Sequence, residues 1–502
     1  MAATVDPQFL DLPHHRLADA ALTRAAALGA THADLRVERT TDRAVRLRDG
    51  RVEGVNDGEE TGLAVRVVVD GTWGFAAGVD LTPEAAVALA EQAVEVARVC
   101  RPMNVEPVEL APEPSYAGVT YVSAYDVDPV QVPAAEMVAL FADRSRRLLD
   151  EPGVAHVEAA LLAVRENKFY ADLAGTSTTQ QRVRVHPVFE AYAVDADSGR
   201  FDSLRTLAPP AGRGWEYCTG TGWDWDAELA ELPGLLAEKM RAPSVAPGRY
   251  DLVVDASNLW LTIHESVGHA TELDRALGYE AAYAGTTFAT VDQLGRLHYG
   301  SPLMHVTGDR TVPHGLATVG WDDEGVVAQQ WDIVRDGTLV GYQLDRRMAA
   351  LQGLGRSNGC AYADSPMHMP LQRMPNVSLQ PAAGGPSTEQ LLAGVEDGVY
   401  VVGDKSWSID MQRYNFQFTG QRFYRVLSGR LAGQLRDVAY QATTTDFWRS
   451  LVALGGPATY RLGGAFNCGK GQPGQVAAVS HGCPTAVFSQ VNILNTSQEG
   501  AP

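Results

Sequence analysis

The sequence predicts an α+β fold in two domains: an N-terminal α/β domain with a mixed or antiparallel sheet, residues 1–240, and a C-terminal β-rich domain, residues 241–502. Residues 62–69 alternate apolar and polar side chains, which is typical of a strand with one buried face. Residues 134–149 instead show the apolar spacing of an amphipathic helix. The stretch 208–248 is rich in Gly, Pro and Trp, and beyond it short strands separated by turn residues predominate. We therefore place the domain boundary near residue 240.

Local signals predict the remaining elements of the N-terminal domain. An Ala-rich segment predicts a helix over 17–28, with Gly29 as its stop. Thr82 and Pro83 are preferred at the N-cap and first position of a helix, so a second helix begins there. Further expected elements are strands over 33–38, 44–47 and 62–69, hairpin turns at Asp49-Gly50 and Asp70-Gly71, a meander of strands over 154–194, and a helix over 226–240.

Charge and composition exclude several classes of function. The chain has 502 residues and a net charge of −20, and such an acidic surface repels nucleic-acid phosphates and anionic lipids. It tolerates cationic or unfolded peptides. No apolar run approaches the roughly 18 residues of a membrane span, and residues 1–15 lack the apolar core of a signal peptide. Five cysteines, an odd and small number, fit a reducing compartment, so we expect a cytoplasmic protein.

One motif carries chemistry. A strand over 249–255 leads into a helix that we expect to begin with Ser257 as N-cap, and this helix contains His264-Glu265-Ser266-Val267-Gly268-His269. The motif resembles the zinc-protease pattern H-E-x-x-H with one additional residue. In a regular α-helix, positions i and i+5 lie roughly 140° apart, so the two imidazoles diverge. A π-helical turn, with Gly268 easing the distortion, brings them onto one face. The sequence therefore predicts either a bulged helix or no metal site.

Given the bulge, roles follow for these residues. His264 and His269 each offer a neutral imidazole nitrogen to zinc, and Glu265 faces the metal-bound water as general base. Zinc lowers the pKa of such water to about 7. A catalytic zinc usually has three protein ligands, and Glu272 and Asp274, one turn downstream, are candidates for the third. Their alternative roles are acceptors for a ligand histidine or a solvated helix face. The alternative for the whole motif is two unconnected histidines on a half-buried helix.

Several segments resemble the TldD/PmbA metalloproteases, on the metal-bearing TldD side, and together they cover essentially the whole chain. These segments are residues 33–77 near the N-terminus, the motif helix within 251–277, the strands within 321–347 and 365–382, and the cysteine segment 467–488 with its Cys-Gly-Lys. The pairing of H-E-x-x-x-H with a later C-G-K is the most specific element. Segments 212–217 (GRGWEY) and 356–362 (RSNGCAY) depart from the family pattern, which leaves substrate preference open.

The resemblance implies zinc held by His264, His269 and Cys468, with Glu265 as catalytic base. A soft thiolate suits zinc. Cys483 competes for the third position, but the family usually has another residue there; for Cys483 and the other cysteines a buried apolar role is the default. His481 gains some interest from its nearness to Cys468 in the sequence, although a structural histidine is the default. Further residues considered for contact with substrate or a structural role are Arg373, Asn376, Trp215, Tyr217, Trp223 and Trp225.

The expected activity is a zinc-dependent peptidase acting on unfolded or small peptides. A peptide strand added beside the site, held by main-chain hydrogen bonds, would allow tolerance of sequence. The resemblance also implies a dimer, formed with a metal-free PmbA-like paralogue or with a second copy. The alternatives are a maturation protease that removes the leader of one modified ribosomal peptide, and a non-enzymatic scaffold or regulator with structural zinc. Glu265 speaks against the scaffold, because a closed structural site does not require it.

Overall fold

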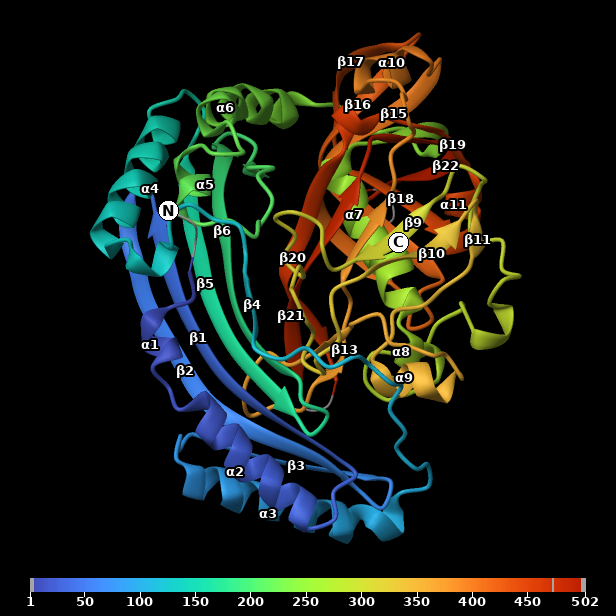
Figure 1. The fold of residues 1–502 in the computed structure, drawn as a ribbon. Coiled ribbons are helices and arrows are strands. Elements are labelled where there is room, and N and C mark those ends of the chain that lie inside the picture. The colour runs from blue at the N-terminus through green and yellow to red at the C-terminus, as the bar shows by residue number, and fades with distance from the viewer. Residues whose placement is uncertain (1–3, 472–473, 498–502) are drawn as a thin grey trace.

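The computed structural model describes residues 4–471 and 474–497, so Gln472 and Pro473 of the expected cysteine segment and residues 1–3 at the N-terminus lie outside it. The expected α+β class is confirmed: two large mixed sheets, each with helices, follow one another along the chain (Figure 1). Within these residues, no helix is long and apolar enough to cross a membrane. The division into domains at residue 240 stays a prediction.

The N-terminal half forms a long curved sheet. Its helices are α1 (Pro7–Leu10), α2 (His14–Ala27), α3 (Pro83–Cys100), α4 (Ala134–Leu149), α5 (Trp215–Thr219) and α6 (Trp225–Arg241). Its strands are β1 (His32–Arg48), β2 (Arg51–Val69), β3 (Thr72–Gly78), β4 (Val119–Val122), β5 (His156–Asp172), β6 (Ser177–Asp195) and β7 (Arg200–Arg205). Their order is β3-β2-β1-β5-β6-β4, with β7 also on β6, and only the β4–β6 pair among these described strands is parallel.

The local signals located most of these elements. Thr82 caps α3 through its side chain, and Gly29 follows α2 with a φ of +94°. Both residues of the Asp49-Gly50 and Asp70-Gly71 turns have positive φ, as a two-residue hairpin of type I′ requires. The expected strands 33–38 and 44–47 are wrong as separate elements, because β1 runs through both without interruption.

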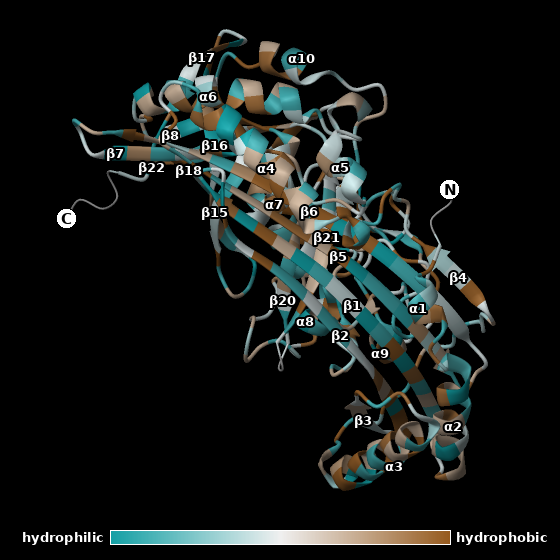
Figure 2. Ribbon diagram, turned by 90° about the vertical axis from the view of Figure 1, so that its left-hand side faces the viewer, coloured by the Kyte–Doolittle hydropathy of each residue, from teal (hydrophilic) through white to brown (hydrophobic). Residues whose placement is uncertain are grey.

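The two faces of this sheet differ in chemistry because side chains alternate along each strand. Leu35 and Leu47 of β1 belong to apolar clusters that include residues of α2 and α3 at one end and of α4 and α6 at the other. Between these helices the outward surface of the strands is largely hydrophilic (Figure 2). Arg36, on the opposite face, instead reaches Asp323 of the C-terminal half. The helices therefore cover one face, and the charged face meets the second half of the chain.

The C-terminal half contains the second large sheet and further strands outside it. Its strands are β8 (Gly248–Val254), β9 (Val306–Asp309), β10 (Gln330–Arg335), β11 (Thr338–Leu339), β12 (Ala361–Tyr362), β13 (Leu371–Gln372), β14 (Asn376–Leu379), β15 (Asp397–Ile409), β16 (Asn415–Leu427), β17 (Arg430–Leu435), β18 (Val438–Thr443), β19 (Leu451–Leu454), β20 (Arg461–Lys470), β21 (Gln475–Cys483) and β22 (Ala486–Asn495). Its helices are α7 (Ala256–Ile263), α8 (Leu273–Ala276), α9 (Arg346–Leu351), α10 (Thr388–Ala393) and α11 (Thr444–Arg449).

The position of α7 and of the β20–β21 hairpin matters most for the site. The large sheet has the order β15-β8-β22-β18-β16-β17, with β19 on β22, and α7 follows directly from β8. The β20–β21 pair forms a separate two-stranded sheet, and in Figure 1 it lies between the N-terminal sheet and the rest of the C-terminal half. Helix α7 thus lies close to a hairpin that is about 200 residues away in the chain, with Cys468 on its first strand.

Buried ion pairs join the two halves. Arg66 Nη2 lies 2.7 Å from Asp34 Oδ2 on the neighbouring strand, and its Nη1 donates to Glu324 Oε1 at 2.9 Å. Lys168 Nζ lies 2.7 Å from Asp323 Oδ2. Breaking a buried pair leaves an uncompensated charge, so these contacts fix how the halves meet.

Stability in acid tests the Asp34–Arg66 pair. Burial raises the pKa of Asp34, but Arg66 and the His32 hydrogen bond outweigh it and hold the pKa at about 2, against an ordinary 3.8. A lowered pKa stabilises the fold above pH 3.8, and this contribution is lost as the pH falls toward 2. The shift is worth about 2 kcal/mol. Between pH 4 and pH 2, the free energy of unfolding of Asp34→Asn, measured in urea, should therefore fall by about 2 kcal/mol less than that of the wild type. The control Asp80→Asn, at an exposed position, should lose as much free energy of unfolding over this pH range as the wild type. An equal loss in all three proteins would contradict the account.

Candidate metal centre

The helix that carries the histidines starts directly after β8. Asp255 Oδ1 accepts a hydrogen bond from the Ser257 backbone N–H at 2.9 Å, so Asp255 is the N-cap. The expected cap, Ser257, is wrong by two residues: its hydroxyl bonds to Asp255 and accepts from Gly403 N–H. Helix α7 then runs through Ile263 with almost every side chain buried.

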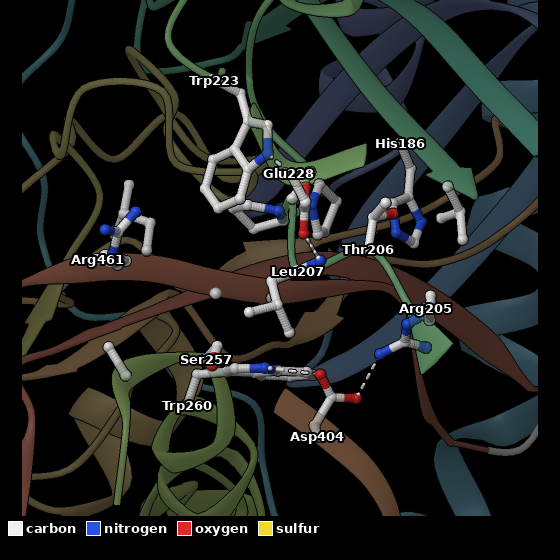
Figure 3. A pocket seen from close by; sticks show the side chains of 18 of the residues that line it. His186, Arg205, Thr206, Leu207, Trp223, Glu228, Ser257, Trp260, Asp404 and Arg461 are labelled. Atoms are coloured by element: carbon white, nitrogen blue, oxygen red, sulfur yellow. Dashed lines mark hydrogen bonds and ion pairs between the residues drawn. The ribbon is translucent and has the colours of Figure 1, made fainter. Parts of the chain in front are cut away.

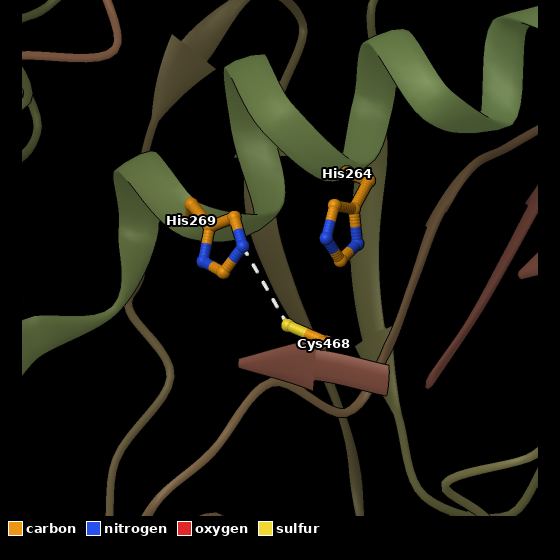
Figure 4. Close-up of side chains that lie close together, drawn as sticks. All are labelled: His264, His269 and Cys468. Carbon is orange, nitrogen blue, oxygen red and sulfur yellow. Dashed lines mark hydrogen bonds between the residues drawn. The ribbon is translucent and has the colours of Figure 1, made fainter. Parts of the chain in front are cut away.

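A π-helical turn over His264–Gly268 follows α7. The backbone N–H of His269 donates to the carbonyl of His264, which is the i→i+5 bond of a π-turn. As a result the two imidazole rings lie 4.7 Å apart between centroids, on the same side of the helix (Figure 4). The predicted distortion is confirmed.

Side chains from other elements satisfy the carbonyls that the distorted turn leaves outside a regular helix. The Tyr299 hydroxyl donates to the Ser266 carbonyl, and the Gln343 amide donates to the Gly268 carbonyl at 2.5 Å. Since buried carbonyls without partners are costly, these bonds stabilise the π-turn against a return to α-helix.

Gly268 has a different role from the expected one. Its φ of −53° and ψ of −61° are ordinary helical values, so the backbone does not require glycine. A Cβ at this position would instead lie 2.6 Å from Met374 Sδ. Glycine is therefore needed for space beneath a buried methionine and not for backbone freedom.

Cys468 joins the two histidines from strand β20. The pairing register of β20 with β21 shifts between Ala465 and Cys468, which indicates a bulge next to the cysteine. Cys468 Sγ lies 3.5 Å from His269 Nε2, and one donor atom from each of His264, His269 and Cys468 lies within 4.8 Å of the others. All three residues are buried, and Figure 4 shows their side chains converging between helix and strand.

A chain of hydrogen bonds orients His264. Its Nδ1 lies 2.7 Å from His481 Nε2, and His481 Nδ1 lies 2.8 Å from the Val377 carbonyl. A carbonyl only accepts, so His481 carries its proton on Nδ1 and its Nε2 accepts from His264 Nδ1–H. This assigned tautomer leaves the lone pair of His264 Nε2 directed at the cluster. The sequence suggested only a structural histidine at position 481, whereas in the structure His481 also orients His264.

Glu272 orients the second histidine in the same way. His269 Nδ1 lies 3.0 Å from Glu272 Oε2, and Lys470 Nζ donates to Glu272 Oε1 at 3.0 Å. Lys470 also bonds Asp274. Of the roles that the sequence left open for Glu272 and Asp274, Glu272 is the acceptor for a histidine, and both lie outside the three-residue cluster.

The pKa shifts of the cluster residues favour the forms that bind metal. Burial lowers the pKa of both His264 and His269, which favours neutral imidazoles. Burial raises the pKa of the Cys468 thiol, but contacts with His269 and Arg373 outweigh it, so the pKa lies below its ordinary value. Neutral imidazole and thiolate are the forms that bind metals.

Arg373 and Asn376 have structural contacts. The Arg373 guanidinium donates to the Cys468 carbonyl and, at 3.1 Å, to the Gln475 carbonyl, which holds β20 in place next to the cluster. The Asn376 amide bonds Asp309 and Thr318. Cys483 is fully buried and bonds the Ala256 carbonyl through its thiol, away from the cluster. The contacts of Arg373 and Asn376 agree with the structural role that we considered for them from the sequence.

Glu265 lies beside the cluster at the wall of a large cavity. Its side chain is 7% exposed, and its Oε2 accepts from Arg413 Nη1 at 2.7 Å. Among the residues that the structure describes, Oε1 makes no hydrogen bond. The sequence did not point to Arg413, because this residue lies 148 positions from Glu265 and belongs to no motif. Lys470 could have been found as the lysine of Cys-Gly-Lys.

The cavity has a volume of about 1040 Å³ and opens between the two halves of the chain. One wall comes from residues within 204–210 and 219–235, and another from residues 461–469 of β20. In Figure 3, Trp223 bonds Glu228, and Asp404 holds both Trp260 and Arg205, at 3.2 and 2.9 Å.

The aromatic run divides between two roles. Trp223 lines the cavity, whereas Trp215 and Tyr217 are buried core residues. Trp225 borders the cavity but is 1% exposed. The departing segments 212–217 and 356–362 contribute no residue to the cavity wall within the described chain.

Comparison with known proteins agrees with the fold. Residues 33–97 match the family model described as PmbA/TldA metallopeptidase domain 1, and residues 247–495 match the C-terminal domain of the same metallopeptidases. A metalloprotease of Methanothermobacter thermautotrophicus is 26% identical over 90% of this chain and 93% of its own. A zinc metalloprotease TldD homologue of Saccharolobus solfataricus is 24% identical over 52% of this chain and 55% of its own.

Solved structures share the fold. TldE from Thermococcus kodakarensis superimposes with a TM-score of 0.70 at 13% identity, covering 94% of this chain and 98% of that one. A Thermotoga maritima protein gives a TM-score of 0.75 at 15% identity, covering 95% and 99%. The matched domains define a metallopeptidase. The chain belongs to the TldD/PmbA family.

The packing at Gly268 is open to test. Gly268→Ala should lower the free energy of unfolding by about 1–3 kcal/mol, because the added methyl group overpacks the site against Met374. Gly234→Ala, within α6 and with open space around its Cβ, should instead raise stability by about 0.5–1 kcal/mol. Urea unfolding measures both variants. Stabilisation by Gly268→Ala equal to that of Gly234→Ala would show that the methionine does not confine this turn.

Proposed function

We propose that the protein is a zinc-dependent peptidase that hydrolyses unfolded or small peptides, with His264, His269 and Cys468 as metal ligands and Glu265 as general base. The observation that carries this proposal is the convergence of the three donor atoms within 4.8 Å, beside Glu265, on the wall of a 1040 Å³ cavity. The family membership supports the general class, and the zinc in the name of the Saccharolobus relative supports the metal.

The donor set fits zinc. Two neutral imidazole nitrogens and one thiolate are donors that zinc accepts, and the hydrogen bonds of His481 and Glu272 leave both Nε2 atoms free for it. Structural zinc sites usually have four protein ligands, whereas the described residues bring three together and the cavity adjoins them. This openness favours a catalytic over a structural site. When bound, zinc polarises a carbonyl and acidifies water.

Glu265 is suited to the work of a general base. Its Oε2 is held by Arg413, while Oε1 is free to accept a proton from a water molecule and to return it to the leaving amide nitrogen. Because Glu265 immediately follows His264, the π-turn that orients the histidines also fixes the carboxylate beside them.

Strand β20 supports an extended peptide as substrate. Among the described strands it pairs only with β21, so its other edge has no strand partner, and its residues 461–469, Cys468 included, line the cavity. A peptide added to this edge would gain main-chain hydrogen bonds whatever its side chains, which a folded protein could not do. The narrower alternative, a protease for a single leader peptide, finds support in Trp223, which with Arg461 forms a distinct side-chain surface at the cavity wall. The dimer partner stays a prediction.

Zinc content should depend on Cys468 and not on Cys483. Cys468→Ala should lose more than about 100-fold in zinc affinity, since removal of a ligand exceeds the 10- to 100-fold cost of losing an outer partner. Cys483→Ala, equally buried but bonded to Ala256, should keep close to one zinc per chain. Metal analysis after dialysis against a competing chelator measures both. Retention of zinc by Cys468→Ala would remove this residue from the site.

Peptide cleavage should depend on Glu265. Glu265→Gln should lower kcat by about 100- to 10,000-fold, the usual contribution of a general base, and zinc should stay bound. The substrate is an unfolded peptide pool, with mass spectrometry of the products. Glu91→Gln serves as the control and should cleave normally, because Glu91 lies exposed on α3, where it pairs with Arg24 of α2. Native-rate cleavage by Glu265→Gln would show that another group accepts the proton, and activity on one peptide alone would favour the leader protease.

A further inference from the structure

Arg413 reaches the Glu265 carboxylate from outside the cavity. Its Nη1 donates to Glu265 Oε2 at 2.7 Å, and the side chain of Arg413 is 14% exposed. Arg413 is not among the residues that line the cavity, whereas Glu265 is. Glu265 is also the only carboxylate within ion-pair distance of Arg413 in the described chain, and the Arg413 Nε is buried without an acceptor there. This guanidinium is thus directed at one group.

Hydrogen bonds within the loop that carries Arg413 fix its conformation. It joins β15 to β16, and the carboxylate of Asp410 accepts hydrogen bonds from the backbone N–H groups of Gln412, Tyr414 and Asn415. The Arg413 N–H donates to the Asp410 carbonyl at 3.0 Å. One carboxylate therefore fixes the whole turn around the arginine.

Hydrogen bonds from other segments of the chain also hold this loop. The Thr444 hydroxyl, at the start of α11, donates to the Arg413 carbonyl at 2.7 Å. The backbone N–H groups of Thr286 and Phe288 donate to the carbonyls of Met411 and Gln412 at 2.8 and 3.0 Å. Anchors on both sides hold the backbone of Arg413 in place relative to the π-turn.

The backbone at Arg413 is strained. Its φ is +60°, a left-handed conformation that costs a residue with a side chain free energy that glycine does not lose. Strained positions with a side chain point to a function of that side chain, because glycine would relieve the strain. Here the side chain makes one ion pair, and that pair is with the proposed base.

We propose that Arg413 is a positioning residue for catalysis: it anchors Oε2 of Glu265 so that Oε1 alone faces the reacting water. The inference rests on the proposed function of Glu265 and adds a residue that acts through it. A single anchored oxygen restricts rotation of the carboxylate, and a loss of alignment at a reacting group is costly in rate. Arg413 does not touch the substrate in this arrangement, so its removal should change kcat and leave KM nearly as it is.

The test compares Arg413→Ala, Arg413→Gly and Arg413→Lys in the zinc-loaded protein. Arg413→Ala should lower kcat by about 10- to 100-fold, with KM within about threefold of wild type. Arg413→Lys keeps the charge at the same φ and should recover part of kcat. Arg413→Gly relieves the strained backbone, so its urea midpoint should exceed that of Arg413→Ala, yet its kcat should be equally low. Recovery of kcat by glycine would show that only the loop conformation matters, and would overturn the proposal.

A double-mutant comparison tests whether Arg413 acts through Glu265. In the Glu265→Gln background, Arg413→Ala should lower kcat no further, since the carboxylate that it positions is gone. Zinc content should stay close to one per chain in every variant, a readout independent of activity. Arg425→Ala serves as the matched control, because Arg425 lies on β16 and pairs with Asp397 away from the cavity. It should cleave at the native rate.

Two failures are distinguishable. If the wild-type protein cleaves peptides and Arg413→Ala cleaves at the same rate, the inference is wrong and the proposed function stands. If the zinc-loaded wild type cleaves no unfolded peptide, the proposed function fails, and the inference fails with it. Additive losses of kcat in the double variant would show that Arg413 acts apart from Glu265, which also overturns the inference.

Discussion

The site depends on one local distortion, the π-helical turn over His264–Gly268. A regular helix would direct the two imidazoles away from each other, and the added residue in the turn brings them within 4.7 Å. Such a turn is costly by itself, because it takes carbonyls out of the helical ladder. Tyr299 and Gln343 satisfy two of these carbonyls. The tertiary structure therefore stabilises the geometry on which the chemistry depends.

The rest of the C-terminal half supplies what the turn lacks. Strand β20 brings Cys468 to the histidines, and its neighbour β21 brings His481, which orients His264. Lys470, two positions after Cys468, compensates the buried charge of Glu272. One hairpin thus provides a donor atom, an orienting histidine and a counter-ion, while residues 461–469 of its first strand line the cavity. The proposed metal ligand and the proposed surface for an extended peptide are thus parts of the same element.

The sequence predicted the elements whose signals are local and missed those that depend on distant partners. The helix at 134–149 and the cap at Thr82 follow from spacing and residue type, and both are present. The middle of β1 was missed because its outward residues, such as Arg39 and Arg43, are polar and pair with acidic side chains, so apolar alternation is lost. At the site, the motif predicted the π-turn, whereas the contact of Arg413 with Glu265 joins residues 148 positions apart and appears only in the folded structure.

The central claim is that two imidazoles and one thiolate share a zinc ion at an open site. X-ray absorption spectroscopy of the zinc-loaded protein tests it most directly. The account predicts two nitrogen ligands at about 2.0–2.1 Å, one sulfur at about 2.3 Å and a further light atom from solvent. A spectrum without sulfur, or with a closed shell made only of protein nitrogen and sulfur, would contradict it.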